Sequence, residues 1–444
     1  MQEWLWQSAS DLGRGIGDGE IDPVALARTY LETIDSHPFR DRIFTMVTHD
    51  RAMAEAEAAA ERAKSGFRLS PLDGVPISWK DLFDTAGLPT EAGSALLKGR
   101  TPDRDAWVLR NATAMGLVCI GKTHMTELAF SGLGLNPVTQ SPPCVNDHDA
   151  VSGGSSSGAA TSVAFGLSAC GIGSDTGGSV RLPSAWNDLV GLKTTAGRIP
   201  LTGVVPLAKT FDTIGPLARS VEDAAMMLAM LEGGEPADLR GATLKGKRFA
   251  ALQTWVLDNV RPEPLAAYTQ ALERLQDAGA IIEPLDVPEV VDPMKQAAVL
   301  FAAEAYGEWR DEIEAQPDLM FARILDRFRG GATVSGPDYV SAWNVLNNAR
   351  ALWVERVSGC DAVLMPSSPI LPPNAQRLIE DPEFFVTENL LALQNTRFGN
   401  LLGLCAVTMP TGVPSCGIMF AGLPMQEERL LRVVAAAEPV LQAG

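Results

Sequence analysis

The sequence predicts an α/β protein, and three observations lead to this fold class. Short apolar runs bounded by Gly and Pro alternate with helical patterns over residues 71–135, which is typical of βαβ units. Hydrophobic residues make up 46% and charged residues 20% of the chain, so the composition is globular and excludes disordered and fibrous classes. The length of 444 residues fits either about three domains or one large α/β unit.

The N-terminal region, residues 8–66, has helical patterns throughout. Asp22 followed by Pro23 predicts a helix start, because Asp is a good N-cap and Pro suits the first helical turn. Residues 52–64 are rich in Ala and Glu, which are strong helix formers. We expect these helices to pack against the rest of the protein rather than to carry chemistry.

The remaining chain alternates between strand and helix patterns, and residues 236–360 read as a more variable layer. Strands are expected at residues 75–79, 117–120, 244–254, 281–285 and 362–364. Helices are expected at residues 106–115, 159–165, 221–231, 264–278, 296–314, 338–357 and 425–442.

The charge balance and the cysteines narrow the function classes. The chain has 36 basic and 54 acidic residues, a net charge of −18, which argues against nucleic-acid binding through bulk electrostatics. Its six cysteines form no CxxC pair, which argues against a disulfide scaffold or a zinc site and favours reduced thiols in the cytoplasm. Neither a signal peptide nor a run of 18 apolar residues is present, so we expect no membrane segment.

Several short motifs have formal matches in an unsuitable context. Residues 116–123 match the phosphate-binding pattern GxxxxGK[ST], but a helical pattern precedes them and residues 117–120 read as a strand. Residues 154–158 match GxSxG, but a nucleophile elbow needs a later histidine and none follows His148. A Ser–His pair that uses His148 stays an alternative, as does a dinucleotide loop at residues 171–177, whose GxGxxxG spacing is one residue too long.

Three further segments stand out, each with a purely structural alternative. Lys80 ends the strand expected at residues 75–79, where a lysine usually reaches solvent. Residues 153–158 read GGSSSG, which is either a flexible linker or a helix start that aims backbone N–H groups at an anion. Residues 171–181 form either a plain glycine-rich turn or a ligand-binding loop. Residues 150–174 contain no charged side chain, which fits a linker or a packed interior.

Together these three segments resemble the amidase signature family. The family pattern is a lysine after a GVP strand, then a GGSS loop, then the motif GSDTGGSxRxP. Here the corresponding positions are Lys80, residues 153–158 and residues 173–183. Residues 121–128 and 211–216 are similar to the family's GKTNMTEF and FDTIGP stretches.

The resemblance is strong over residues 65–230 and poor over residues 236–360. Residues 146–152 are shorter than the family's usual approach to the GGSS loop, and residues 183–195 depart from its PAAxCGxxGLKPT stretch. These departures leave the substrate class open, while the catalytic set is untouched.

The resemblance implies one domain over residues 1–444, with a large mixed β-sheet core and helices on both of its faces. Residues 65–230 would form the catalytic core, and residues 236–360 would shape the substrate pocket. The implied activity is hydrolysis of a carboxamide C–N bond through an acyl-enzyme, which releases a carboxylic acid and ammonia or an amine. The expected partner is a small-molecule amide, with no cofactor and no metal, and a homo-oligomer stays open.

The resemblance also implies the roles of individual residues, with Ser179 as nucleophile, Ser155 as bridging serine and Lys80 as base. It further implies a cis peptide bond before Ser155. The full set of implied site residues comprises the catalytic Lys80, Ser155 and Ser179, the backbone donors to the oxyanion at Thr176, Gly177, Gly178 and Ser179, and the supporting Ser156, Asp175 and Arg181.

This arrangement is chemically coherent because a serine hydroxyl needs a base, and lysine is a base only when neutral. A lysine pKa of about 10.4 must fall by about three units to serve near neutral pH, which burial beside residues 150–174 could supply. Asp81 should face away from Lys80, because neighbouring strand residues point to opposite faces. Asp175 and Arg181 are expected to form a buried ion pair rather than to contact substrate.

Alternatives to a stand-alone amidase remain. One is the glutaminase subunit of a tRNA-dependent amidotransferase, which belongs to the same family and works in a complex. Another is a nucleotide-binding protein that uses residues 116–123 or 171–177, and a third is a non-catalytic binding protein on the same fold. Trp79 and Trp186 are either core residues or pocket walls.

Overall fold

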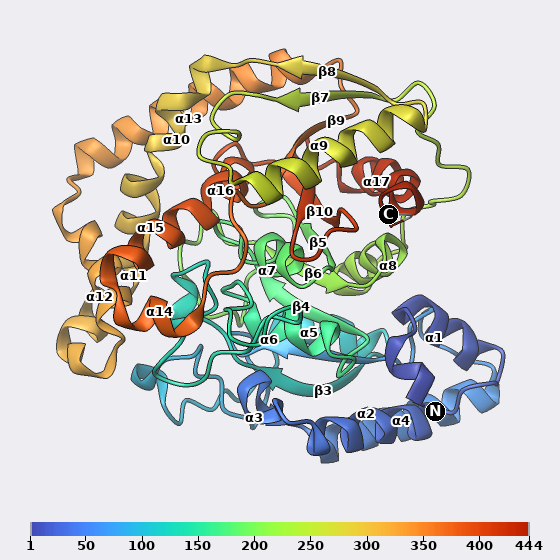
Figure 1. Ribbon diagram of the computed structural model, residues 1–444. Coiled ribbons are helices and arrows are strands. Elements are labelled where there is room, and N and C mark those ends of the chain that lie inside the picture. Colours follow the sequence, from blue (N-terminus) through green and yellow to red (C-terminus); the bar gives the residue numbers. More distant parts are fainter. Residues whose placement is uncertain (1, 443–444) are drawn as a thin grey trace.

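The computed structural model of the protein describes residues 2–442, which contain a mixed sheet of 11 strands (Figure 1). The strand order is β1-β3-β2-β4-β6-β5-β10-β11-β9-β7-β8, and parallel and antiparallel pairs both occur. The predicted α/β class and the implied mixed sheet are therefore confirmed. The strands are β1 (Phe44–Val47), β2 (Pro76–Lys80), β3 (Val118–Thr123), β4 (Cys170–Ser174), β5 (Val190–Lys193), β6 (Ile214–Ala218), β7 (Arg248–Leu252), β8 (Ile281–Leu285), β9 (Ala362–Pro366), β10 (Cys405–Pro410) and β11 (Gly417–Gly422).

Helices surround this sheet. The α-helices are α1 (Ala9–Gly17), α2 (Pro23–Ser36), α3 (Arg40–Ile43), α4 (His49–Ser65), α5 (Trp107–Ala114), α6 (Ser157–Ala164), α7 (Arg181–Trp186), α8 (Val221–Glu232), α9 (Pro262–Asp277), α10 (Val291–Lys295), α11 (Ala297–Ala315), α12 (Ala322–Arg329), α13 (Gly336–Val357), α14 (Ala375–Glu380), α15 (Pro382–Ala392), α16 (Gln394–Leu401) and α17 (Glu427–Gln442). Short 3₁₀ helices are η1 (Gln2–Trp6), η2 (Ala95–Leu97), η3 (Glu127–Ala129), η4 (Pro288–Val290), η5 (Pro317–Leu319) and η6 (Gly330–Thr333).

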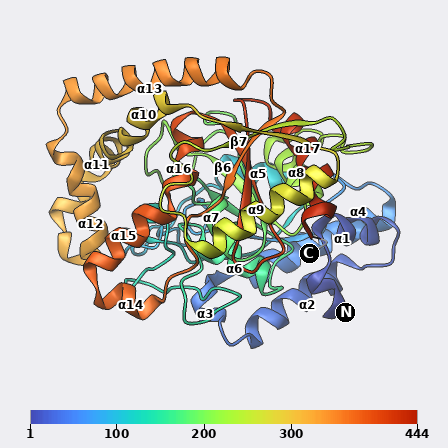
Figure 2. The ribbon, with the colours of Figure 1, turned by 45° about the horizontal axis from the view of Figure 1, so that its top comes forward.

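The central strands are buried on both faces of the sheet. Every residue of β2, β3, β4, β5, β6 and β9 is buried, although side chains alternate between the two faces along a strand. Such burial requires a layer of helices on each side, as Figure 2 shows. The layers exclude water from the middle of the sheet, where the predicted site residues lie.

The N-terminal helices form as predicted from their capping residues and composition. The Asp22 side chain accepts a hydrogen bond from the Ala25 N–H at 2.8 Å, and Pro23 occupies the first turn of α2. Helices α2 and α4 pack against each other and against β3 (Figure 1). Strand β1 was not predicted, because it is only four residues long, follows directly on α3 and lacks an alternating apolar pattern. Only Phe44 of this strand is buried.

The region after residue 236 contributes to the same sheet. The strands expected at residues 244–254 and 281–285 are β7 and β8, which extend the sheet beyond β9 by parallel pairing. Helices α11, α12 and α13 lie together at one side of the molecule, far from α2 and α4 (Figures 1 and 2). This region therefore supplies both an edge of the sheet and a group of helices beside it.

Candidate active site

Lys80 ends strand β2 and is completely buried. Its Nζ donates to Ser155 Oγ at 2.7 Å and to Ser174 Oγ at 2.8 Å. Burial lowers the pKa of Lys80 to about 7, although the carboxylates of Asp175 and Asp212 act in the opposite direction. A substantial fraction of this amine is thus unprotonated at neutral pH, which is the form that accepts a proton.

Asp81 points away from Lys80, as its position in the strand predicts. Its carboxylate instead pairs with Lys122 Nζ at 2.9 Å, and both side chains are buried. The nearest acidic neighbour in sequence therefore does not hold the Lys80 amine in its charged form.

Ser155 lies in the loop that opens helix α6. The Gly154–Ser155 peptide bond is cis, as the resemblance implies. A Cβ at Gly154 would lie 2.7 Å from the backbone nitrogen of Gly134, so only glycine allows this close approach. Nearly all of residues 150–174 are buried. This uncharged segment is therefore packed interior and not a linker.

Ser156, a predicted supporting residue, connects this loop to β4. Its hydroxyl donates to the Ser174 carbonyl at 3.1 Å and accepts from the Ser174 N–H at 3.3 Å. Ser156 thereby holds Ser174, the second acceptor of the Lys80 amine. Ser174 was not predicted as a site residue, although it lies inside the GSDTGGS motif.

Ser179 follows β4 in the loop before α7 and lines a cavity. Its carbonyl accepts a hydrogen bond from the Ser156 N–H at 3.2 Å, which places Ser179 beside the Ser155 loop. Within residues 2–442 its hydroxyl makes no hydrogen bond to a protein group. The structure thus joins Lys80 to Ser155 directly and brings Ser179 next to them without a Ser155–Ser179 hydrogen bond.

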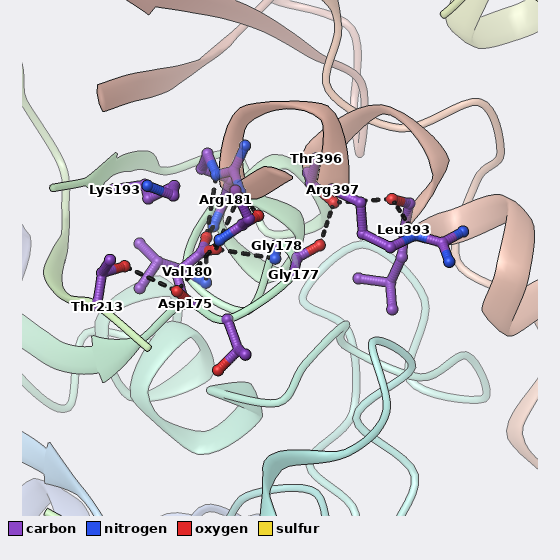
Figure 3. A network of polar contacts seen from close by, with 12 residues as sticks. Asp175, Gly177, Gly178, Val180, Arg181, Lys193, Thr213, Leu393, Thr396 and Arg397 are labelled. Carbon is purple, nitrogen blue, oxygen red and sulfur yellow. Dashed lines mark hydrogen bonds and ion pairs between the residues drawn. The ribbon is translucent and has the colours of Figure 1, made fainter. Parts of the chain in front are cut away.

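A buried ion pair anchors the Ser179 loop, as predicted (Figure 3). Arg181 Nη2 lies 2.9 Å from Asp175 Oδ1, and neither side chain has any exposed surface. The Asn400 amide of α16 donates to the same Asp175 oxygen at 2.8 Å. Burial alone would raise the pKa of Asp175, but the adjacent Arg181 guanidinium keeps it well below its usual range. Asp175 is thus a fixed negative charge that holds the loop.

One of the four predicted backbone donors is already engaged. The Gly178 N–H donates to Asp175 Oδ1 at 2.8 Å, so this group holds the loop instead of pointing freely at a substrate. Gly178 has a φ of +135°, and a Cβ there would overlap the Thr396 side chain. In the part of the chain that the structure describes, no protein acceptor takes the N–H groups of Thr176, Gly177 or Ser179. These three are the donors available to an oxyanion.

Two side chains that were not predicted from the sequence hold the donor loop. Asp212 accepts from the Thr176 hydroxyl at 2.5 Å, and Thr396 Oγ1 donates to the Gly177 carbonyl at 2.8 Å. Asp212 lies in the FDTIGP stretch, which was a usable signal. Thr396 comes from α16, in a segment without any recognisable motif, so only the folded chain reveals it.

The cavity next to Ser179 has a volume of about 240 Å³. Its walls come from the Ser179 loop, from residues 129–131 and from helices α11, α12, α15 and α16. Trp79 and Trp186 do not line it and are fully buried in the core. The lining residues are Ala129, Phe130, Ser131, Thr176, Gly177, Ser179, Leu207, Ala297, Ala298, Phe301, Ala302, Asp326, Arg327, Gly330, Leu390, Leu393 and Arg397.

The alternative motifs have the wrong surroundings for nucleotide binding. Residues 118–123 are strand β3 itself, and Lys122 is buried against Asp81. Residues 170–174 are strand β4, so the glycine spacing at 171–177 spans a strand and the following loop. His148 packs against the ring of Phe39 at 4.8 Å between centroids and does not line the cavity.

Residues 2–442 contain neither a membrane-spanning helix nor a metal-binding cluster. No helix in this range is both long enough and apolar enough to cross a bilayer. No group of three or more His, Cys, Asp or Glu side chains in the same range is placed to hold a metal ion.

Comparisons with known proteins agree with this geometry. The profile of the family described as Amidase matches residues 25–431. The chain is 34% identical to 2-amino-5-chloromuconic acid deaminase of Comamonas testosteroni, over 96% of this chain and 94% of that protein. It is 31% identical to a subunit of glutamyl-tRNA(Gln) amidotransferase from Anaeromyxobacter dehalogenans (strain 2CP-C), over 96% and 95%. Among solved structures, native peptide amidase from Stenotrophomonas maltophilia superposes with a TM-score of 0.80 at 26% identity, over 98% of this chain and 96% of that one.

Proposed function

Because the chain belongs to the amidase family and is an enzyme that hydrolyses amides, we propose that it does so through Lys80, Ser155 and Ser179 with a covalent acyl-enzyme. The observation that carries this proposal is the pair of hydrogen bonds from the buried Lys80 amine to Ser155 and Ser174. A buried amine with a pKa of about 7 is a base suited to neutral pH.

In the first half of the reaction, Lys80 Nζ accepts the proton of Ser155 Oγ while Ser155 accepts the proton of Ser179. Ser179 Oγ then forms a bond to the amide carbon, and the carbonyl π electrons move to the oxygen. The N–H groups of Thr176, Gly177 and Ser179 stabilise this oxyanion, and each such donor is typically worth about 100- to 1000-fold in rate. The C–N bond breaks as Ser155 returns a proton to the leaving nitrogen, so ammonia or an amine departs.

In the second half, a water molecule attacks the Ser179 ester and gives its proton to Ser155. The C–O bond to Ser179 breaks, Ser179 regains its proton, and a carboxylic acid is released. Both halves require a Ser155–Ser179 hydrogen bond once substrate is bound. Catalytic hydrogen bonds often form fully only in the substrate complex.

The supporting groups act through the catalytic ones. Asp175, paired with Arg181, fixes the loop that carries Ser179, and Ser156 fixes Ser174 against the Lys80 amine. We place the catalytic core at residues 65–230 in a single domain over residues 1–444, with residues 236–360 shaping the pocket. The six free cysteines support a reducing, cytoplasmic location.

A second candidate is the glutaminase subunit of an amidotransferase. The observation that favours it is the 31% identity to the glutamyl-tRNA(Gln) amidotransferase protein over nearly the full length of both chains. Such a protein would hydrolyse glutamine and hand on ammonia in a complex. Turnover of several amides by the purified chain alone, with none of glutamine, would remove this candidate.

The decisive experiment compares Ser179→Ala with Ser162→Ala. Ser162 is a buried serine of α6 that contacts Ser78 at 2.8 Å and does not line the cavity. We expect Ser179→Ala to lose at least about 1000-fold in kcat and to stay folded, whereas Ser162→Ala should retain activity. In the wild type, hydroxylamine should divert the acyl group to a hydroxamate, and mass spectrometry should find the acyl adduct on Ser179. An active Ser179→Ala variant would refute the proposal.

A further inference from the structure

Two arginines line the cavity beside Ser179 without an acidic partner. Arg327 comes from helix α12 and Arg397 from helix α16, and both are partly buried. Within residues 2–442 neither guanidinium forms an ion pair with an acidic side chain. By contrast Arg329, two residues further along α12, pairs with Glu314 at 2.8 Å. The cavity therefore holds positive charge that the described part of the chain does not neutralise.

The two guanidinium groups are held in place by groups that carry no negative charge. Arg397 Nε donates to the Leu393 carbonyl at 3.0 Å and its Nη2 to the Leu390 carbonyl at 2.8 Å. The guanidinium carbon of Arg327 lies 4.7 Å from the centroid of the Phe130 ring, and its buried Nε has no hydrogen-bond partner in residues 2–442. Such an unpaired buried donor is unfavourable unless a ligand completes it.

Arg397 also lies directly against the Ser179 loop, as Figure 3 shows for Arg397 and Gly177. A Cβ placed at Gly177 would lie 3.3 Å from Arg397 Cγ. A ligand whose amide carbon is at Ser179 would therefore have its far end within the part of the cavity that the arginines line. Phe301, Leu207 and Leu393 supply apolar walls between.

Electrostatics favour an anion in this cavity. Burial lowers the pKa of Arg327 to about 10, with a further contribution from the charge of Arg397, and burial alone lowers that of Arg397 to about 10. Both groups stay charged at neutral pH, although burial of an unpaired charge is unfavourable. Asp326 also lines the cavity, but it is exposed and forms no ion pair with either arginine among the described residues. A bound anion would offset the cost of both charges.

We propose that the amide substrate carries a carboxylate on its acyl group, and that Arg327 and Arg397 bind this carboxylate while Ser179 attacks the amide. A carboxylate matches the planar array of N–H donors on a guanidinium better than any neutral group does. The acyl side is the appropriate place, because the leaving group of a primary amide is ammonia and leaves only the acyl group to fill the cavity. This inference rests on the proposed amide hydrolysis at Ser179.

The test compares amides that differ only in this charge. Succinamate and glutaramate are matched with 4-methylpentanamide and 5-methylhexanamide, in which an isopropyl group replaces the carboxylate. Ammonia release gives kcat/KM for each amide with the wild type and with Arg327→Gln, Arg397→Lys and Arg329→Gln. Arg329→Gln is the matched control, since Arg329 lies on the same helix but does not line the cavity.

We expect the wild type to prefer the charged amides by at least about tenfold, the factor typical of a charge-assisted hydrogen bond. Arg327→Gln should lose this preference mainly through a higher KM and leave the neutral amides almost unaffected. Arg397→Lys keeps the charge and should retain part of the preference, and Arg329→Gln should retain all of it. Calorimetric binding of glutarate should weaken at least about tenfold in Arg327→Gln, which tests the site without turnover.

The outcomes separate this inference from the proposed function. Turnover of neutral and charged amides at equal kcat/KM would overturn the carboxylate site and leave the Ser179 mechanism standing. Preference for N-acetylglycine, whose carboxylate is on the amine side, over succinamate and glutaramate would overturn the acyl-side placement. Failure of the wild type to hydrolyse any amide would refute the proposed function itself.

Discussion

The pKa of Lys80 predicts how activity depends on pH. Burial lowers this pKa from its ordinary value of 10.5 to about 7, against the opposing carboxylates of Asp175 and Asp212. Because only the unprotonated amine accepts a proton, kcat/KM should rise about tenfold per pH unit below about pH 7 and level off above it. A lysine of ordinary pKa would instead give an activity that is still rising at about pH 9.

The same shift predicts how stability depends on pH. Between pH 10.5 and about pH 7 the unfolded chain holds a proton on Lys80 that the native protein lacks, so native stability falls as the pH falls. The difference of 3.5 units, 10.5 minus 7, corresponds to about 5 kcal/mol in total. About 2 kcal/mol of this change falls between about pH 9 and about pH 7.

Lys80→Met removes both effects and therefore tests them together. We expect hydrolysis to fall at least about 1000-fold, and the free energy of unfolding to lose the part of its pH dependence that Lys80 contributes. The measurements are kcat/KM for a primary amide from about pH 6 to about pH 9, and urea unfolding at the two ends of the upper range. Lys245→Met, which removes an exposed lysine, is the control and should keep the wild-type activity profile.

Three results would refute this reasoning. One is a kcat/KM that continues to climb through about pH 9, since the base would then have an ordinary pKa. Another is near-normal turnover by Lys80→Met, since a different group would then accept the proton. The third is a constant difference in unfolding free energy between the wild type and Lys80→Met at both pH values.

Further predictions concern the groups around the catalytic residues. Gly178→Ala should abolish activity, because a Cβ there meets α16 and the φ of +135° disfavours any side chain; retained kcat would contradict the tight loop. Arg181→Met should lower the free energy of unfolding by about 3–5 kcal/mol, because it leaves the Asp175 carboxylate buried and unpaired, and urea denaturation measures this loss. An unchanged midpoint would show that the pair is dispensable. Ser174→Ala removes an acceptor from the Lys80 ammonium, so the acid limb of the pH–rate profile should move to lower pH, and an unmoved limb would exclude Ser174 from tuning the base.

The candidate catalytic residues were easier to predict from the sequence than the fold around them. Lys80, Ser155 and Ser179 lie in motifs whose glycines fix the backbone locally, so short stretches carry enough information to find them. Strands β10 and β11 were not predicted, because they are buried on both faces and lack an alternating pattern.

The cavity arginines could not be predicted from the sequence. Arg327 looks like its neighbour Arg329 in the sequence, and only the folded chain shows that one lines the cavity and the other pairs with Glu314. Similarly, the sequence indicates a glycine at position 178 but not that Asp175 engages its N–H group. Contacts between segments about 200 residues apart depend on packing that no local pattern records.

The position of β10 and α16 has a consequence for synthesis of the protein. Strand β10 lies between β5 and β11 in the sheet, and Asn400 and Thr396 of α16 hold the loop that carries Ser179. A chain still emerging from the ribosome contains Lys80, Ser155 and Ser179 long before these last elements appear. Its exposed β5 edge is then unpaired and prone to association with other chains. Hydrolytic competence therefore arises only when translation is nearly finished, which protects the cell from a partly built enzyme.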